Sequence, residues 1–406
     1  MKSKCVACLP VAFLFLLTAG FFRPAAAQSP TIDGLLDADF YGAPLAVQDT
    51  PTAFGNATNG HRRFAVQGSE LDAAYARVSD GYLFLFIAGN LETAGNGVQW
   101  SVGNMNKLDI FVDAIPGGQN SLRGDNVFVD DGALGNMGHW DTNNIGLRFD
   151  TGFEADFYLT FYNRTDVVPY YDPPQVEAWR GFLYYATLPT GGGGTARTLG
   201  TAQDPTHTSF VTTFIFTNGV KMGFNNANTG GVWGTGDANE ADTSLAASVT
   251  NGLELALPIE LFADDAGALN DTIRIVAFVN DIYHRSMSNQ VLGPMGQTSG
   301  GYGNLGDPRL FNFAEFYSPG DQFFAAANPY PSARALLAPE AGENDAATFR
   351  WLGSVGHTYV LQVATNLAGP QVWTDAGGST LATGPVVSVI ATNAMSVNFY
   401  RTRRLD

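Results

Sequence analysis

Residues 73–88 read AAYARVSDGYLFLFIA, and this stretch decides the fold class. Apolar and aromatic residues fill both sides of the polar triplet Ser79-Asp80-Gly81, a sequence that favours a tight turn. Short apolar runs bounded by turn residues are typical of β-strands. The stretch therefore predicts a hairpin formed by residues 73–78 and 82–88.

The same pattern continues along the chain. Short runs rich in β-branched and aromatic residues predict further strands at residues 108–112, 157–162, 181–188, 209–216 and 273–279. Asn218-Gly219 predicts another tight turn, and one short helix is expected at residues 259–263. We therefore predict an all-β chain whose main part is a large antiparallel β-sandwich, jelly-roll-like, with alternate side chains entering the core between two sheets.

Residues 1–27 are typical of a secretory signal peptide. Lys2 and Lys4 precede an apolar run over residues 5–17, and Ala25-Ala26-Ala27 supplies the small residues at which a signal peptidase cleaves. We expect cleavage after Ala27 and a secreted protein, extracellular or periplasmic. The later sequence contains no run of about 20 apolar residues, so no membrane insertion is expected.

The mature chain is strongly acidic and has no cysteine. Cys5 and Cys8 both lie in the leader, so disulfide bonds cannot stabilise the mature protein and a large core must do so. Removing the leader takes away three basic residues and no acidic one, which leaves 18 basic against 38 acidic residues and a net charge of about −20. Such a charge argues against nucleic acid and anionic membranes as partners.

A domain boundary is predicted near residues 329–340, where Pro329, Pro331 and Pro339 interrupt the strand pattern. We interpret residues 28–328 as the large sandwich, residues 329–340 as a linker and residues 341–406 as a small second β unit. The strands expected in that unit lie at residues 347–352, 358–364, 386–390 and 397–401.

Four segments of the large unit occur in an order that resembles the family-nine carbohydrate-binding modules and the related DOMON-like sandwiches. They are TIDGLLDADFY at 31–41, YLFLFI at 82–87, LDIFVD at 108–113 and LELALPIELF at 253–262, which a strand at 273–281 follows. The resemblance covers roughly residues 30–325, with long insertions between the third and fourth segments. It implies a sandwich fold and a carbohydrate-binding function.

The C-terminal residues are similar to small fibronectin type III-like modules of bacterial secreted proteins. FRW at 349–351, GHTYVLQ at 356–362, Trp373 and FYR at 399–401 carry this resemblance. Such modules act as spacers, surface attachments or export-related tails, and their aromatic residues are expected in the core.

Candidate ligand contacts are aromatic residues in predicted loops, because sugar recognition by sandwiches rests on aromatic faces with a few polar groups beside them. The candidates are Trp140, Tyr170, Tyr171, Trp179 and Trp233. The same residues could instead pin their loops onto the sandwich, and the sequence leaves both readings open.

Calcium is the cofactor that the composition favours, since it binds oxygen ligands from Asp, Asn and backbone carbonyls in loops. Two acidic loops are candidates, although neither has the spacing of an EF-hand. The first contains Asp125, Asp130 and Asp131, and the second contains Asp237, Asn239 and Asp242. Asx-rich turns of a solvated acidic surface are the simpler explanation of either loop.

Asp109 and Asp113 share one face of a predicted strand, since they are four residues apart. They could orient a loop or bind a cation, but we expect that they lie on an exposed face. The five histidines are scattered singly, and no motif of a metalloprotease or serine hydrolase is present. Glu154 and Asp156 could act as a glycosidase pair, although acidic pairs are unavoidable in such a chain.

The sequence thus favours a secreted, non-catalytic binding protein that recognises carbohydrate or cell-surface material. One alternative is a structural protein of the extracellular matrix or surface layer that assembles with copies of itself. Another is a polysaccharide-cleaving enzyme whose active site is formed by the insertions between Asp113 and Leu253.

Overall fold

A computed structural model of the protein describes residues 29–50, 69–91, 106–130, 133–138, 146–168, 175–204, 214–228, 230–232, 243–264, 268–293, 295, 305–315, 320–330, 336–341, 346–353, 355–364, 372–391 and 399–405. Within this part the chain forms several antiparallel sheets with a few short helices, as an all-β sandwich should. The predicted fold class is confirmed.

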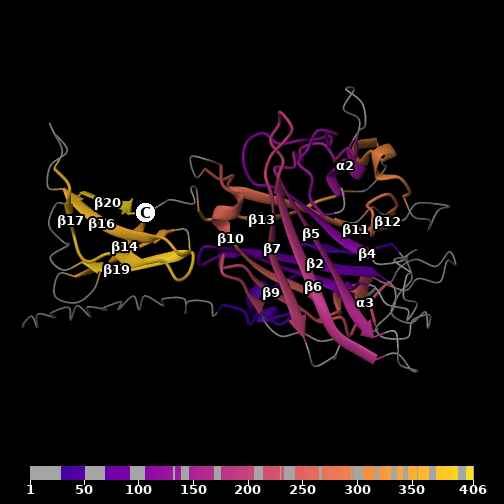
Figure 1. Cartoon of the computed structure of the whole chain (residues 1–406), viewed down its shortest axis with the longest axis horizontal. Helices are drawn as coiled ribbons and strands as arrows, with labels where there is room; N and C mark the ends of the chain where they lie inside the picture. Colours follow the sequence, from indigo (N-terminus) through magenta and orange to yellow (C-terminus); the bar gives the residue numbers. More distant parts are fainter. Residues whose placement is uncertain are drawn as a thin grey trace, which may run out of the picture.

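Two antiparallel sheets build the large unit (Figure 1). The first has six strands in the order β1-β2-β3-β10-β9-β8, with bounds β1 Ala46–Val47, β2 Glu70–Ser79, β3 Tyr82–Asn90, β10 Gly252–Pro258, β9 Lys221–Phe224 and β8 Phe214–Ile215. The second has seven strands in the order β12-β11-β4-β5-β6-β7, with β13 also paired to β11. Its bounds are β12 Met287–Leu292, β11 Thr272–Asp281, β4 Asn106–Asp113, β5 Phe157–Val168, β6 Gln175–Thr187, β7 Ala196–Asp204 and β13 Phe324–Ala327.

The predicted strands of this unit coincide with observed ones. The hairpin is β2–β3, and β4, β5, β6 and β11 contain or overlap the runs expected at residues 108–112, 157–162, 181–188 and 273–279. Of the strand expected at residues 209–216, the described part is β8 together with Phe216. The predicted turn at Asn218-Gly219 joins β8 to β9, where Gly219 N–H donates to the carbonyl of Phe216.

The main core lies between the two sheets. Leu108, Ile110 and Val112 of β4 point into it. They join alternate side chains of β3 and β10, which are Leu83, Leu85, Ile87, Leu253, Leu255 and Leu257. Burying apolar surface on this scale is the main source of stability for a chain of this size.

A third layer covers the opposite face of the seven-stranded sheet. Described parts of residues 119–155 and 305–323, including α2 Ala133–Met137 and η3 Phe313–Glu315, pack apolar side chains onto Phe111, Tyr158 and Phe278. The short helix η2 Pro308–Leu310 lies in the same layer, next to α2. This layer buries Asp109 and Asp113, which are 0% and 4% exposed. The expectation that these two aspartates lie on an exposed face is wrong, because segments distant in sequence cover that face.

Shorter elements complete the large unit. On the outer face of the six-stranded sheet, Phe40 and Tyr41 of α1 Ala38–Tyr41 pack on Phe84 and Phe86. A further helix, α3 Thr243–Ala247, contacts β2. The short helix expected after Pro258 is a 3-10 helix, η1 Ile259–Phe262. None of the described helices is both long and apolar enough to cross a membrane.

Two small sheets lie toward the C-terminus (Figure 1). One contains β14 Leu336–Ala341, β15 Ala347–Leu352 and β19 Val386–Ala391, and the other contains β17 Thr374–Asp375, β16 Thr358–Ala364, β18 Thr380–Leu381 and β20 Phe399–Arg404. Phe349, Trp351 and Leu361 form a separate small core between them. β14 begins inside the range that the sequence suggested as a linker.

The small sheets pack against the sandwich at the β2–β3 turn. Leu352 of β15 belongs to the main sandwich core, and Val386 packs beside it. Gly81 has a φ of 78°, which favours glycine, and a Cβ atom there would lie 2.9 Å from Cδ2 of Leu352. The turn predicted from sequence is therefore also a close contact between the two parts of the chain.

Candidate functional site

Little can be described of the five aromatic residues that the sequence suggested as ligand contacts. Outside the described residues lie Trp140, Tyr170, Tyr171 and Trp233, together with the side chain of Trp179. The backbone of Trp179 is part of β6, between Thr165 of β5 and Asp204 of β7. Their role as ligand contacts stays a prediction.

In the first acidic loop each described carboxylate already has a cationic partner. Asp125 accepts hydrogen bonds of 2.8 and 2.7 Å from Arg123, and this guanidinium holds the pKa of Asp125 below its ordinary value. Asp130 forms an ion pair with Lys107. The two aspartates therefore engage different cations.

The remaining metal candidates lie outside the described residues; they are Asp131, Asp237, Asn239 and Asp242. Across the described ranges, no group of three or more His, Cys, Asp or Glu side chains is placed to hold a metal ion. A cation site in the described part would therefore need amide or carbonyl oxygens as well as carboxylates.

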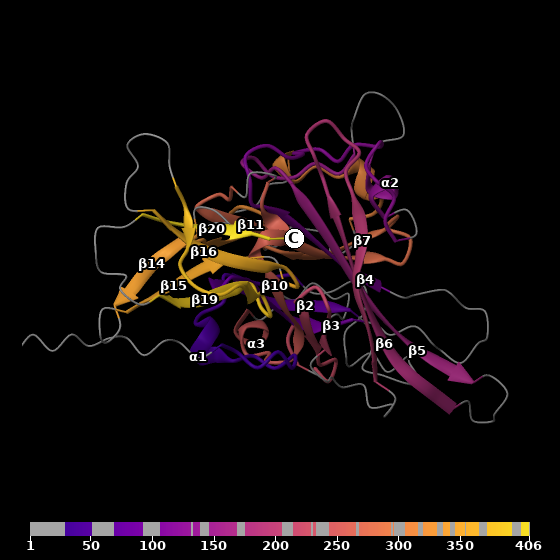
Figure 2. The same ribbon diagram turned by 60° about the vertical axis from the view of Figure 1, so that its left-hand side comes forward.

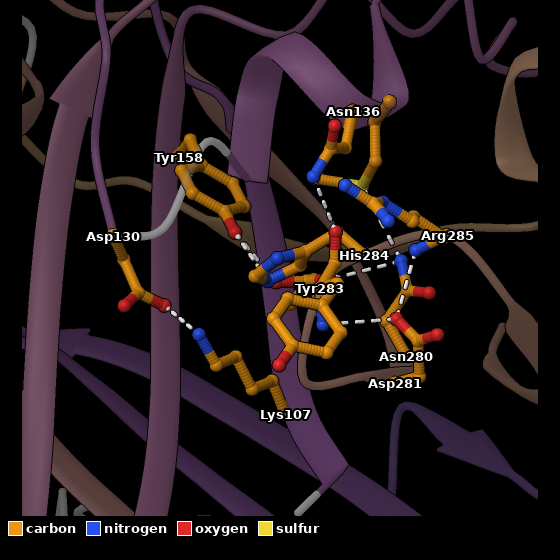
Figure 3. A network of polar contacts seen from close by, with 11 residues as sticks. Lys107, Asp130, Asn136, Tyr158, Asn280, Asp281, Tyr283, His284 and Arg285 are labelled. Atoms are coloured by element: carbon orange, nitrogen blue, oxygen red, sulfur yellow. Dashed lines mark hydrogen bonds and ion pairs between the residues drawn. The ribbon is translucent and has the colours of Figure 1, made fainter. Parts of the chain in front are cut away.

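A network of buried polar side chains lies between the seven-stranded sheet and its covering layer (Figure 3). Nε2 of His284 lies 3.1 Å from Oδ1 of Asp109, and the hydroxyl of Tyr158 donates to the same oxygen over 2.6 Å. Nδ2 of Asn280 donates to Oδ2 of Asp109 over 3.2 Å. Asp109 thus accepts hydrogen bonds from Tyr158 and Asn280 and lies within ion-pair distance of His284.

The sheet register brings these groups together. Asp109 on β4 pairs with Phe278 on β11, and Asn280 lies two residues beyond Phe278 and so on the same face. Tyr158 on β5 pairs with Phe111, which lies two residues beyond Asp109. The side chains of Asp109, Asn280 and Tyr158 therefore share one face of the sheet. His284 belongs to the turn that follows β11, and its backbone N–H donates to the carbonyl of Asp281 over 3.0 Å.

This network is closed to solvent. Asp109, Tyr158 and His284 are all 0% exposed, and burial together with the charge of Asp109 raises the pKa of Tyr158 well above its ordinary value. Nδ1 of His284 and Oδ1 of Asn280 are buried with no hydrogen-bond partner in the described part of the protein. Because no external molecule can reach Asp109, we interpret the network as a set of polar contacts that hold the covering layer on the seven-stranded sheet.

Next to the covering layer, the outward face of β5 and β6 carries three partly exposed aromatic rings. Tyr162 and Phe182 are directly opposite in the register, and their rings stack with centroids 4.7 Å apart. Tyr184 stacks on Tyr162 at 6.2 Å, and Nζ of Lys107 lies 4.8 Å from the centroid of the Tyr162 ring. We call Tyr162, Phe182 and Tyr184 the aromatic ladder.

Hydroxyl groups border the aromatic ladder on the neighbouring strand. Thr198 of β7 pairs with Tyr184 and Thr201 pairs with Phe182, and both threonines are exposed. The β5–β6 hairpin that carries the ladder extends away from the body of the sandwich (Figure 2). Sequence reasoning missed the ladder because it searched loops, although Phe182 and Tyr184 alternate within a predicted strand.

An open cavity of about 490 Å³ at the end of β4 is lined by residues that include Asp113 and Glu154. The neighbouring Asp156 is buried, and its carboxylate accepts the N–H groups of Ala114 and Ile115 over 2.8 and 2.9 Å. Burial raises the pKa of Asp156 to about 7, and the charges of Asp113 and Glu154 act in the same direction. Of the pair considered as a glycosidase acid and nucleophile, only Glu154 lines the cavity.

A second cavity, of about 630 Å³, lies where the sandwich meets the small C-terminal sheets. Arg197, Glu260 and Asp264 line it from the sandwich, and His357 and Arg404 line it from the other side. Groups of both charge signs converge there, an arrangement suited to a polar ligand.

Sequence reasoning also missed two buried carboxylates at the start of β2. Glu70 and Asp72 are 1% and 0% exposed, and burial raises the pKa of each. The charge of Asp72 raises the pKa of Glu70 further. The signal in the sequence is the acidic alternation Glu70-Leu71-Asp72 immediately before an apolar hairpin.

Comparisons of the chain with protein-family models, with curated proteins and with solved structures found no match. The function therefore has to be argued from the geometry of the chain itself.

Proposed function

We propose that this protein is exported and binds carbohydrate or cell-surface glycan through the aromatic ladder, without catalysing a reaction. The observation that carries the proposal is the stack of Tyr162, Phe182 and Tyr184 on a sheet face bordered by exposed threonines. Aromatic rings pack on the C–H surfaces of sugars, and neighbouring hydroxyl groups bond to sugar hydroxyls. The leader at residues 1–27 and the resemblance to carbohydrate-binding sandwiches support the same function.

The net charge narrows the class of glycan. A mature chain with a net charge of about −20 repels polyanions at ordinary ionic strength. Neutral or basic glycans are therefore the expected ligands.

Burial of the acid and imidazole groups favours binding over catalysis. The Asp109–His284 pair would be the natural acid–base couple of an enzyme, yet both side chains are 0% exposed. A general acid or base must come within hydrogen-bond distance of its substrate. The pair is better explained as support for the covering layer.

The test is binding of the purified mature chain, residues 28–406, to a panel of soluble and insoluble polysaccharides. Tyr184→Ala and Phe182→Ala should each weaken binding about fivefold, since one ring contact is worth roughly 1 kcal/mol. Phe128→Ala is the matched control, because Phe128 is an aromatic residue that is 76% exposed but lies outside the ladder. Trp140→Ala and Trp233→Ala test the loop residues in parallel.

Equal loss of binding in the Phe128 and ladder variants would point to a nonspecific apolar effect. Retention that only Trp140→Ala or Trp233→Ala abolishes would move the site to the loops. Absence of retention on every glycan would remove the carbohydrate proposal.

Self-assembly is a second candidate, and the edge strand β7 favours it. Among the described strands, β7 pairs only with β6, so one side of a nine-residue strand can accept another chain. Sedimentation velocity over a wide concentration range tests this function. A monomer at every concentration would exclude assembly through β7, and a rising sedimentation coefficient would support it.

A further inference from the structure

The carboxylates of Glu70 and Asp72 lie close together because β2 contains a β-bulge. The register with β3 shifts between Leu71, which pairs with Gly89, and Ala73, which pairs with Ala88. Asp72 is therefore the extra residue of the bulge, and such residues turn a side chain out of strict alternation. Both carboxylates reach the same amide group, that of Asn228.

The amide of Asn228 has more acceptors than it can satisfy. Its Nδ2 lies 2.8 Å from Oε1 of Glu70, 3.0 Å from Oδ2 of Asp72 and 2.9 Å from the carbonyl oxygen of Gly230. An amide nitrogen carries only two hydrogens. Three oxygens thus surround Nδ2 of Asn228, and two of these oxygens belong to carboxylates.

Within the part of the chain that the structure describes, no lysine, arginine or histidine forms an ion pair with Glu70 or Asp72. Two other buried aspartates have such a partner, since Arg274 lies 3.1 Å from Asp113 and Lys107 pairs with Asp130. Two adjacent buried carboxylates without a countercharge are costly to keep ionised.

A further buried oxygen, Oδ1 of Asn90, lies beside the pair. Asn90 of β3 pairs directly with Glu70 in the register, so the two side chains share one face. Nδ2 of Asn90 donates to the carbonyl of Asn228 over 3.3 Å, whereas Oδ1 of Asn90 is buried with no hydrogen-bond partner in the described structure. This side chain is 2% exposed.

The backbone of residues 230–232 packs closely against the carboxylate of Asp72. The N–H of Val232 donates to Oδ1 of Asp72 over 2.8 Å. A Cβ atom at Gly231, where φ is 103°, would lie 1.9 Å from the same oxygen. Only glycine allows the segment 230–232 to fold over the carboxylate in this way.

We propose that Glu70, Asp72, Asn90 and Asn228 form a binding site for one divalent cation, calcium, at the start of β2. The cation takes oxygens from the two carboxylates, from Oδ1 of Asn90 and from the carbonyl of Gly230, with the amide of Asn228 turned to present its oxygen. All these ligands are hard oxygen donors, which calcium binds in irregular sets of six to eight, whereas magnesium demands a near-ideal octahedron. This site differs from the two acidic loops that the sequence suggested.

The experiment uses the full mature chain, freed of metal by dialysis against EDTA. Calcium is titrated by isothermal calorimetry, and thermal unfolding is followed in EDTA and in millimolar calcium. We expect one calcium per chain and a higher Tm in calcium, because a ligand that binds only the folded state stabilises it. Magnesium should bind at least about tenfold more weakly.

Variants locate the site. Glu70→Gln and Asp72→Asn should each weaken calcium binding about tenfold or more, because the number of charged ligands sets the affinity. Asn90→Ala should weaken it without a change of charge. Asp125→Asn is the matched control, since Asp125 is an exposed acidic residue of the predicted loop and forms an ion pair with Arg123. The calcium affinity of this variant should equal that of the wild type.

Two results would overturn the proposal. One is a folded wild-type chain, verified by circular dichroism, that shows no heat and no Tm shift with calcium. The other is calcium binding that persists unchanged in Glu70→Gln, Asp72→Asn and Asn90→Ala, which would place the cation elsewhere. If one carboxylate variant does not fold, the other and Asn90→Ala still decide between these outcomes.

Discussion

The hydroxyl of Tyr41 donates a hydrogen bond of 3.0 Å to Oε1 of Glu254, which lies 213 residues further along the chain. The other carboxylate oxygen, Oε2, accepts the backbone N–H groups of Asp33 and Gly34 over 3.0 and 3.2 Å. One buried carboxylate thus holds the N-terminal segment against β10, and it joins the first and last of the four segments in the family resemblance.

Removing the carboxylate of Glu254 should destabilise the protein strongly. Glu254→Ala leaves two backbone donors and one hydroxyl without their acceptor, and we expect a loss of about 3 kcal/mol in the free energy of unfolding by urea. Tyr41→Phe removes only one of these bonds and should cost about 1 kcal/mol. Equal losses in the two variants would show that Glu254 does not hold the backbone of the N-terminal segment.

The Lys107–Asp130 ion pair should show strong coupling. The side chains of its two residues are 1% and 4% exposed, so either single change leaves a buried charge. Lys107→Met and Asp130→Leu should each cost roughly 3 kcal/mol, whereas the double variant should cost less than the sum of the two. A double-mutant cycle in urea measures the difference. Additive losses would mean that the two groups do not interact.

The contact between the sandwich and the C-terminal sheets can be tested with two glycines. Gly152→Ala, at a φ of 85° with no atom within 4 Å of the new Cβ, should cost about 1 kcal/mol through backbone strain alone. Gly81→Ala has the same strain and also drives Cβ against Leu352, so it should cost more.

The same variant should also loosen the packing of the C-terminal sheets. Limited proteolysis should then cut Gly81→Ala within residues 329–340 faster than it cuts Gly152→Ala. Identical digestion rates would show that the turn at Gly81 does not hold the C-terminal sheets.

The pH dependence of stability should contain a contribution from Asp156. Its folded-state pKa of about 7 lies above the ordinary value, so the folded protein binds a proton that the unfolded chain has already released. This contribution is present at pH 4 and below and is lost as the pH rises toward and through 7. A tenfold change in proton affinity corresponds to about 1.4 kcal/mol, so the loss should be about 2–4 kcal/mol.

Asp156→Asn is the comparison for this effect, since an amide oxygen can still accept the N–H groups of Ala114 and Ile115. Between pH 4.5 and 8 the wild type should lose more stability than the variant, measured by urea unfolding at each pH. Parallel curves for the two proteins would contradict the raised pKa.

The sequence by itself determined the strands that carry a clear apolar run, the tight turns and the pairing of the first hairpin. Period-two patterns and turn residues are local, so residues 73–88 specify β2 and β3 without help from the rest of the chain. The same local logic placed Asp109 and Asp113 on one face of β4, but it could not say what covers that face.

Only the tertiary structure decided which polar residues meet. The burial of Asp109 depends on the described parts of residues 119–155 and 305–323. The contact of Glu70 with Asn228 depends on a bulge and on a hydrogen bond across 158 residues. The period-two pattern of a strand predicts which side chains share a face, but it carries no information about the segment that packs on that face. The aromatic ladder arises in the same way, because Tyr162 and Phe182 stack only once the register of β5 and β6 is set.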